Sequence, residues 1–167
     1  MSDQYLYSPW RLDYIQSEKP DECILCLCQS RGTDEENLVV HRGKHWFAML
    51  NRYPYNNGHI MLAPYLHERR LSDLPDEVMD ELGDLLQISE QALQYAYNCD
   101  GINIGINLGR AAGAGIEEHL HVHLDPRWNG DSSFMSVVAG QRVIAESFSV
   151  SFARLREAFS KILNDNE

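Results

Sequence analysis

Three histidines near residue 120 alternate with apolar residues. His119, His121 and His123 are separated by Leu120 and Val122. In a β-strand successive side chains point to opposite faces, so the three imidazoles would share one face, about 6.6 Å apart, and the apolar residues would enter a core. Packing alone gives no reason for three histidines on one face of a strand. The pattern therefore predicts an enzyme whose reacting groups lie along this strand.

A glycine-rich loop, residues 109–115, precedes the histidines. It lacks the Gly-Lys-Ser/Thr ending of a P-loop and the Gly-x-Gly-x-x-Gly fingerprint of dinucleotide-binding folds. Glycines still let backbone N–H groups approach an anion closely, and a turn of such groups can bind phosphate oxygens. Beside three histidines, the loop predicts an anion-binding site.

Two kinds of chemistry suit several imidazoles and backbone donors. In one, His-x-His supplies two ligands to a metal ion that activates water. In the other, a histidine attacks phosphorus while its neighbours stabilise the phosphate oxygens and the leaving group. The residues alone leave both alternatives open.

The elements that position these residues are mainly strands. Besides the histidine strand, strands are predicted at residues 38–40, 45–50, 59–63 and 101–108. The second and third would form an antiparallel hairpin around the turn-rich segment 51–58, and a connection of that length often carries function. Pro126 is expected to end the histidine strand, and residues 134–138 have some β character.

Two helices are predicted. The first begins at Asp73 as N-cap, has Pro75 in its first turn, and continues to about Tyr97. The second covers Ser151 to Leu163, with apolar residues on one face. Together these elements predict an α+β fold: an antiparallel sheet of about five strands, with a long helix and a C-terminal helix packed on one face.

Composition excludes several classes of protein. The 167 residues are 44% apolar, enough for one domain with a sizeable core, and their net charge of -11 argues against a nucleic-acid binder that follows phosphates with a basic face. No apolar run reaches the ~20 residues that span a membrane, and the N-terminus lacks the features of a signal peptide. We therefore expect a cytoplasmic protein with one domain over residues 1–167: an arm at 1–22, a core at 38–128, and a tail with a helix at 129–167.

Three of the four cysteines, Cys23, Cys26 and Cys28, are close together. In the cytoplasm they are expected to be reduced thiols or metal ligands rather than disulfides. The Cys23-x-x-Cys26 spacing fits two thiolates on one metal ion, whereas Cys28 is not expected to be a ligand.

The chain resembles the histidine triad family, whose pattern is His-φ-His-φ-His-φ-φ with φ apolar. His119, His121 and His123 match the histidines, and Asp125 departs from the last apolar position. The resemblance extends from about residue 38 to 128. It implies the family's fold and a homodimer with the two sheets side by side.

The resemblance also implies roles for particular residues. His121 would be the nucleophile that attacks the α-phosphorus and forms a nucleotidyl-histidine, and His123 would assist the leaving group. His119 and His59 would line the site and orient the imidazoles. The substrate-binding positions would be Asn51 for the ribose hydroxyls, and Asn107 with the backbone of Gly113, Ala114 and Gly115 for phosphate oxygens.

Within the family, the chain is most similar to the diadenosine tetraphosphate phosphorylase-like subgroup, through residues 8–11, 51–56, 107–110 and 127–131. Family hydrolases often carry Gln and Ser or Thr where this chain has Gly115 and Ile116. The resemblance therefore implies a nucleotidyl transferase or hydrolase that cleaves dinucleoside polyphosphates at the α-phosphate, with phosphate as the preferred acceptor. The alternatives are a hydrolase of dinucleoside polyphosphates or nucleoside phosphoramidates, and a non-catalytic nucleotide- or zinc-binding interaction protein.

A structural zinc ion is implied too, held by Cys23, Cys26, His67 and His119. Two thiolates and two imidazoles form a closed tetrahedral set. The alternative is two buried thiols beside a surface His67. Mg²⁺ is expected, if at all, only with the polyphosphate.

Asp125 would lie on the histidine face if the alternation continues. There it could accept a hydrogen bond from an imidazole and raise the pKa of that ring. The interpretation we favour is that the strand already turns toward Pro126, which leaves Asp125 in solvent.

Overall fold

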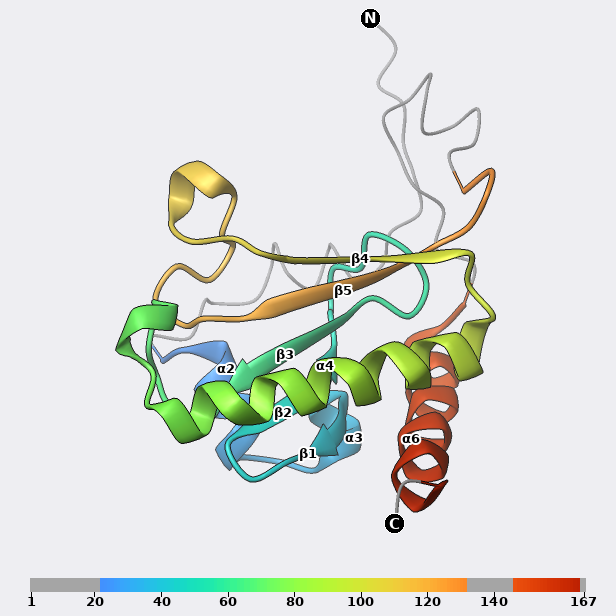
Figure 1. Ribbon diagram of the computed structural model, residues 1–167, viewed down its shortest axis with the longest axis horizontal. Coiled ribbons are helices and arrows are strands. Elements are labelled where there is room, and N and C mark those ends of the chain that lie inside the picture. The colour runs from blue at the N-terminus through green and yellow to red at the C-terminus, as the bar shows by residue number, and fades with distance from the viewer. Residues whose placement is uncertain (1–21, 132–145, 166–167) are drawn as a thin grey trace, which may run out of the picture.

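The computed structural model describes residues 22–131 and 146–165, so most of the predicted arm and the predicted β character at 134–138 lie outside the described residues. Five strands form one antiparallel sheet (Figure 1). In chain order they are β1 (Val39–Arg42), β2 (Trp46–Leu50), β3 (Ile60–Pro64), β4 (Gly101–Ile106) and β5 (Val122–Arg127). In space the order is β1-β2-β3-β5-β4. The predicted α+β fold with a five-stranded antiparallel sheet is confirmed.

The predicted hairpin is the centre of this sheet. β2 and β3 pair over their full length, from Trp46 opposite Pro64 to Leu50 opposite Ile60. Every residue of both strands is buried, because packed elements cover both faces. The segment between the strands, residues 51–59, is therefore attached at both ends to fully buried strands.

Two long helices cover one face of the sheet: α4 (Asp76–Tyr97) and α6 (Phe148–Asp165) (Figure 1). The core beneath them includes Trp46, Leu62 and Leu124, and the Trp46 indole N–H donates to the Val78 carbonyl of α4 at 2.7 Å. Among the described residues no helix is both long and apolar enough to cross a bilayer.

The start of α4 differs from the prediction. Its N-cap is Pro75, and Asp73 instead ends a short 3-10 helix, η1 (Leu71–Asp73). Steric clash with the proline ring disfavours helical conformation for the preceding residue, and Leu74 is accordingly extended, with ψ of 138°. The helix therefore cannot begin at Asp73.

The opposite face of the sheet carries a helix that the sequence analysis missed. α2 (Ile24–Ser30) packs Leu25 and Cys28 against Phe47 and Met49, so the expectation of helices on one face only is wrong. With seven residues, α2 is too short to show an apolar period. A second short helix, α3 (Asp34–Asn37), follows it.

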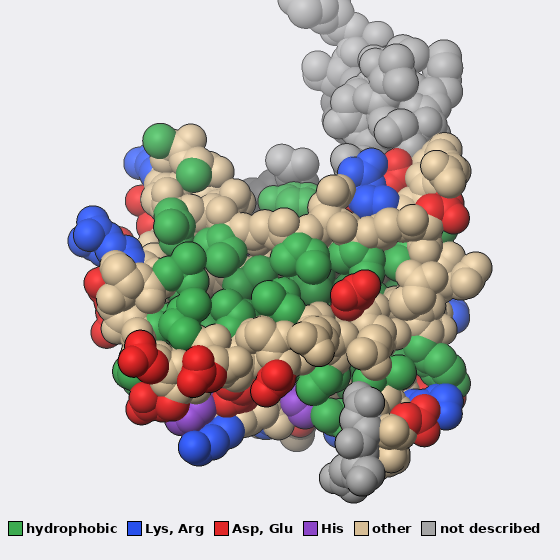
Figure 2. All heavy atoms as spheres, in the orientation of Figure 1, with side chains coloured by type: hydrophobic (Ala, Val, Ile, Leu, Met, Phe, Trp, Pro, Cys, Tyr) green, Lys and Arg blue, Asp and Glu red, His purple; other side chains and the backbone are tan. Residues whose placement is uncertain are grey.

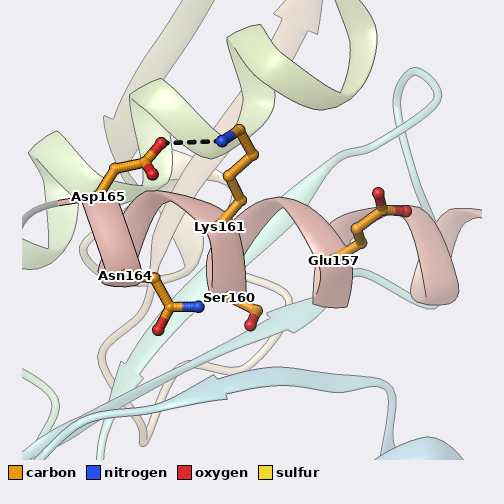
Figure 3. A pocket seen from close by; sticks show the side chains of 5 residues that line it. All are labelled: Glu157, Ser160, Lys161, Asn164 and Asp165. Carbon is orange, nitrogen blue, oxygen red and sulfur yellow. Dashed lines mark hydrogen bonds and ion pairs between the residues drawn. The ribbon is translucent and has the colours of Figure 1, made fainter.

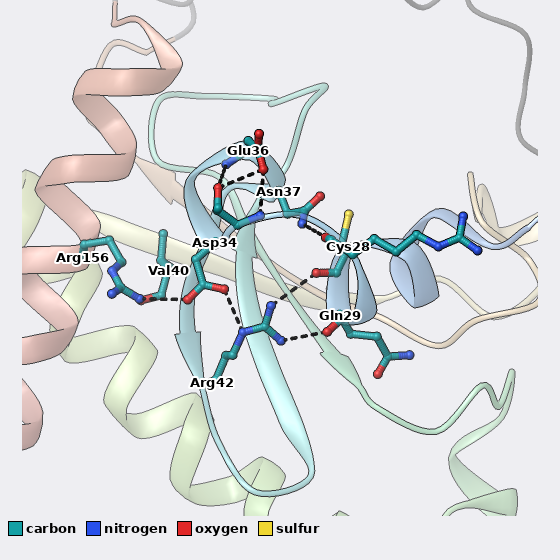
Figure 4. A network of polar contacts seen from close by, with 10 residues as sticks. Cys28, Gln29, Asp34, Glu36, Asn37, Val40, Arg42 and Arg156 are labelled. Atoms are coloured by element: carbon teal, nitrogen blue, oxygen red, sulfur yellow. Dashed lines mark hydrogen bonds and ion pairs between the residues drawn. The ribbon is translucent and has the colours of Figure 1, made fainter.

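A network of polar contacts ties α2 to the rest of the molecule (Figure 4). Arg42 on β1 donates to the Cys28 and Gln29 carbonyls at 3.3 Å, and to Asp34 Oδ1 at 2.8 Å. Arg156 on α6 approaches the other oxygen of Asp34 at 3.5 Å. Arg42 thus supplies donors to carbonyls near the end of α2, which lack helical partners.

The histidine strand is shifted relative to the prediction. β5 begins only at Val122, and it continues through Pro126, which pairs with Ile102 of β4. β3 pairs with β5 only at residues 122–124, so no β3 carbonyl requires the backbone N–H that Pro126 lacks. The prediction that Pro126 ends the strand is therefore wrong.

Candidate functional site

The predicted alternation of faces holds although His119 and His121 precede β5. Leu120, Val122 and Leu124 all belong to the core under α4 and α6. His119 and His121 are buried on the other side, 0% and 4% exposed. The sheet adds a fourth imidazole, because β3 runs beside β5 and the residue before β3 is His59. The predicted cluster of His59, His121 and His123 therefore exists in the structure.

His121 has a defined tautomer. Its Nδ1 lies 2.9 Å from the His119 carbonyl oxygen, which can only accept, so Nδ1 carries the proton. Burial lowers the pKa of the imidazole, which is therefore neutral at pH 7. Nε2 then holds a lone pair, which is the state that a nucleophile needs.

His59 and His123 form a hydrogen-bonded pair. The Tyr55 backbone N–H donates to His59 Nδ1 at 3.1 Å, so His59 carries its proton on Nε2. That Nε2–H points at His123 Nδ1, 3.0 Å away. Burial, reinforced by neighbouring histidines, lowers the pKa of His59 to about 3 and that of His123 to about 4. Both rings are neutral at pH 7, and the proton of His123 lies on Nε2.

These tautomers give the site complementary functions. His121 presents a lone pair and His123 presents an N–H donor, and the two rings stand edge to face with centroids 4.9 Å apart. A phosphorus atom attacked by one ring would thus have a hydrogen-bond donor beside it for a departing oxygen.

The two predicted substrate-binding asparagines lie beside the histidines in different ways. Asn51 is buried next to His59, with its Nδ2 3.4 Å from the ring and its Oδ1 accepting the Tyr53 N–H. Asn107 follows Ile106, which pairs with Val122, so its backbone is level with His121. Their contacts with a ligand stay predictions.

The glycine loop contains a short 3-10 helix, η2 (Arg110–Ala112). In the described conformation the N–H groups of Gly113 and Ala114 donate within the loop, to Arg110 at 2.9 Å and to Gly109 at 3.3 Å. An anion bound by these two groups would have to displace those bonds. The phosphate-binding role of Gly113, Ala114 and Gly115 therefore stays a prediction.

The four predicted metal ligands come together. Donor atoms of Cys23, Cys26, His67 and His119 all lie within 4.8 Å of one another. The Cys pair belongs to the start of α2, His67 follows β3, and His119 precedes β5. His119 Nε2–H donates to the Pro64 carbonyl at 2.9 Å, which leaves the lone pair on Nδ1, the atom that faces the sulfurs.

The distances fit a tetrahedral ion. Zn–S and Zn–N bonds of about 2.3 and 2.05 Å, at tetrahedral angles, separate sulfur from nitrogen by about 3.6 Å. The separations here are 3.3 Å for Cys23 Sγ to His119 Nδ1, 3.2 Å for Cys26 Sγ to His67 Nδ1, and 3.5 Å for Cys26 Sγ to His119 Nδ1. The donor set can therefore hold zinc without a change of fold.

The favoured interpretation of Asp125 is wrong. The residue is only 6% exposed, because β5 continues past it instead of turning into solvent. Its Oδ1 lies 3.9 Å from His59 Nδ1, which is too long for a hydrogen bond.

A separate pocket of about 340 Å³ lies along α6 (Figure 3). Its lining residues are Glu157, Ser160, Lys161, Asn164 and Asp165. All five belong to one helix, and Lys161 pairs with Asp165 at 3.1 Å. None of the reacting histidines lines it, so it is not part of the candidate site.

Two backbone groups that define the site were missed by the sequence analysis. The Tyr55 N–H fixes the tautomer of His59, and the Pro64 carbonyl fixes that of His119. Every residue has such groups, so no side-chain pattern distinguishes them. Only the three-dimensional structure identifies them.

Comparison with known proteins agrees with this geometry. The HIT domain model matches residues 33–130. A protein named AP-4-A phosphorylase from Mycobacterium tuberculosis is 39% identical over 156 residues, which cover 86% of this chain and 77% of the relative. A bis(5'-adenosyl)-triphosphatase from Saccharomyces cerevisiae is 31% identical over 93 residues, 54% of this chain and 44% of the relative. The crystal structure of a Zn-bound histidine triad family protein from Mycobacterium smegmatis has a TM-score of 0.69 and 27% identity, and covers 87% of this chain and 97% of the other. The chain belongs to the HIT domain family.

Proposed function

We propose that the protein is a phosphorylase of dinucleoside polyphosphates, with diadenosine tetraphosphate as the preferred substrate. It would transfer a nucleotidyl group first to His121 and then to inorganic phosphate. The observation that carries the proposal is the His121 tautomer: a buried neutral ring whose Nδ1–H is held by the His119 carbonyl, so that Nε2 is the attacking atom.

In the first step, His121 Nε2 attacks the α-phosphorus and a P–N bond forms. The bond from this phosphorus to the bridging oxygen breaks, and the departing nucleoside polyphosphate takes the electron pair. The His123 Nε2–H donates a hydrogen bond to the departing oxygen. The positive charge on the His121 ring is stabilised by the carbonyl that accepts its Nδ1–H.

In the second step, an oxygen of inorganic phosphate attacks the same phosphorus. The P–N bond breaks and its electron pair returns to His121 Nε2. With diadenosine tetraphosphate the products are ATP from the first step and ADP from the second. With water as the acceptor, the second product would be AMP.

Two observations support phosphate as the acceptor. The most extensive of the sequence matches described above is to a protein named AP-4-A phosphorylase. In addition, Gly115 and Ile116 stand where family hydrolases often have Gln and Ser or Thr, and neither side chain can orient a water molecule by hydrogen bonding.

Product analysis tests the acceptor. Diadenosine tetraphosphate is incubated with the protein, with and without inorganic phosphate, and the nucleotides are separated. ADP plus ATP that form only with phosphate are expected. AMP plus ATP in both reactions would make the protein a hydrolase, and binding without turnover would leave a nucleotide-binding protein.

We further propose that Cys23, Cys26, His67 and His119 hold a structural zinc ion. The tetrahedral spacing of their donor atoms supports this, and the set has no position left for water or substrate. Zinc would fix the ring of His119 and, through its carbonyl, the orientation of His121.

A homodimer is part of the proposal. Figure 2 shows apolar side chains gathered on the face that α4 and β4 share. Ile104 of β4 is 49% exposed, and Ile102 and Ile106, which share its face of the strand, are partly buried. β4 is the last strand of the described sheet, so a second copy could pair with its edge and cover this surface.

A further inference from the structure

One buried side chain connects the segment between β2 and β3, residues 51–59, to the end of β5. Asn56 is 7% exposed, and its Nδ2 donates to the Pro126 carbonyl at 3.0 Å and to Asp131 Oδ2 at 3.1 Å. Both partners can only accept, so the nitrogen of the amide must face them, and both of its hydrogens are used. Asn56 thus joins this segment to the end of β5.

The acceptor on Asp131 is itself fixed. Arg127 Nη2 donates to Asp131 Oδ1 at 2.9 Å, while its Nη1 donates to Asn103 Oδ1 of β4 at 2.8 Å. The Arg127 guanidinium holds the pKa of the Asp131 carboxyl well below its usual range. Asp131 is therefore a carboxylate at neutral pH, and Arg127 connects it to two strands of the sheet.

From Asn56 the contacts continue to the reacting histidines. The His59 N–H donates to the Asn56 carbonyl at 3.3 Å, and the preceding residue, Tyr55, donates its N–H to His59 Nδ1. The Tyr55 ring also lies against that of His59, with centroids 4.6 Å apart. The backbone at Tyr55 and Asn56 thus makes direct contact with the ring that donates to His123.

We propose that Asn56 is a positioning residue that fixes the tautomers of His59 and His123. Its anchor on Pro126 and Asp131 holds the Tyr55 N–H against His59 Nδ1, which forces the proton of His59 onto Nε2. His123 must then accept at Nδ1 and carry its own proton on Nε2. The importance of this N–H for turnover rests on the proposed function.

The alternative tautomers show what the anchor prevents. If the Tyr55 N–H moves away, His59 Nδ1 is left with the longer contact to Asn51 Nδ2, at 3.4 Å. His59 can then carry its proton on Nδ1 and accept at Nε2 from His123 Nδ1–H. His123 would then present a lone pair to the departing oxygen in place of a donor. Lone pairs on both atoms repel, so the step that breaks the P–O bond would slow while nucleotide binding elsewhere is kept.

Asn56→Asp tests the proposal, because it keeps the shape but replaces a donor with an acceptor facing a carbonyl and a carboxylate. Asn57→Asp is the matched control: it adds the same charge one residue away, and its carboxylate can still accept the Glu146 N–H. Nitrogen NMR of ¹⁵N-histidine-labelled protein distinguishes protonated from unprotonated ring nitrogens, with His59 and His123 assigned from His→Gln variants. Turnover of diadenosine tetraphosphate is measured on the same samples.

Asn56→Asp is expected to mix the tautomers of His59 and His123 and to lower kcat at least about tenfold with KM changed much less. Asn57→Asp is expected to keep both the tautomers and kcat. If Asn56→Asp does not fold, Asp131→Asn, which weakens the same anchor from outside the segment, is expected to shift the nitrogen signals in the same direction. Unchanged tautomers in the folded variant would overturn the proposal. These spectra need no substrate, whereas failure of the proposed function would appear as a wild-type protein that forms no ADP from diadenosine tetraphosphate and inorganic phosphate.

Discussion

Removal of the proposed zinc ligand Cys26 should lower stability by an amount that follows from the topology of the site. The ion would join α2 to His67 and His119, which lie 41 and 93 residues from Cys26 along the chain. A covalent link that closes loops of these lengths reduces the entropy of the unfolded chain by an equivalent of about 4–5 kcal/mol. Unlike a covalent link, zinc is released when the chain unfolds, so it stabilises the folded state by RT ln(1 + [Zn]/Kd). This reaches a similar value, about 4 kcal/mol, when free zinc is about 1,000 times its Kd.

For a domain of this size, each kcal/mol corresponds to about 2–4 °C in Tm, so zinc should raise Tm by roughly 8–20 °C. The assay is thermal unfolding of the zinc-loaded and the chelator-treated protein, with bound zinc measured in parallel. Cys26→Ser is expected to abolish both the bound zinc and the difference in Tm. Cys99→Ser is the control, because Cys99 is a free thiol that is not among the four proposed ligands. A wild-type protein that binds zinc without a rise in Tm, or a Cys26→Ser variant that keeps the rise, would refute the reasoning.

Three further predictions concern other parts of the molecule. The pKa of His59 is about 3 in the folded protein and 6.5 when unperturbed. Below pH 6.5 the unfolded state therefore binds more protons than the folded state. The free energy of unfolding should fall as the pH falls, by up to about 1.4 kcal/mol per pH unit. Urea unfolding at pH 7, 6 and 5 should therefore give a steeper decline for the wild type than for His59→Gln, and equal slopes would contradict the assignment. Arg42→Ala removes the donors at the end of α2 and should weaken zinc binding about tenfold in a chelator competition. Arg156 contacts β1 but not α2, so Arg156→Ala should leave zinc binding unchanged. Equal losses of zinc affinity in the two variants would mean that the anchoring of α2 does not affect the site. Ile104→Glu places a charge on the proposed dimer surface and should give a monomer in analytical sedimentation. Val150→Glu, at an equally exposed position on α6, should stay dimeric. A dimeric Ile104→Glu would exclude this surface as the dimer interface.

The parts of the fold that the sequence predicted well are those where periodicity is strong. The alternation in β4 and the apolar runs of β2 and β3 identified the sheet, and the helical spacing after residue 76 identified α4. α2 escaped because a helix of two turns has no measurable period. α3 offered a signal that could have been used, since Thr33 and Glu36 form a capping box.

The candidate site also has parts that the sequence identified and parts that it did not. Imidazoles and thiols are rare side chains, and their spacing identified the three alternating histidines and the Cys23-x-x-Cys26 pair. The resemblance to the histidine triad family added His59 and the complete set of four proposed zinc ligands, which the structure brings together. Asn56 stood among ordinary turn residues, and nothing in its neighbours distinguished it from Asn57. The burial of Asp125 depends on how far β5 continues, which depends on the pairing of Pro126 with β4. Such long-range pairing is absent from a local pattern.

The central claim is that His121 Nε2 forms a covalent bond to the α-phosphorus. The most direct test is acid-free quenching of the protein during turnover of diadenosine tetraphosphate, followed by peptide mass spectrometry. We predict an adenylyl group on the peptide that contains His121, assigned to that ring by fragmentation and lost when inorganic phosphate is added in excess. Turnover by His121→Asn at the wild-type rate, or a label on another residue, would contradict the account.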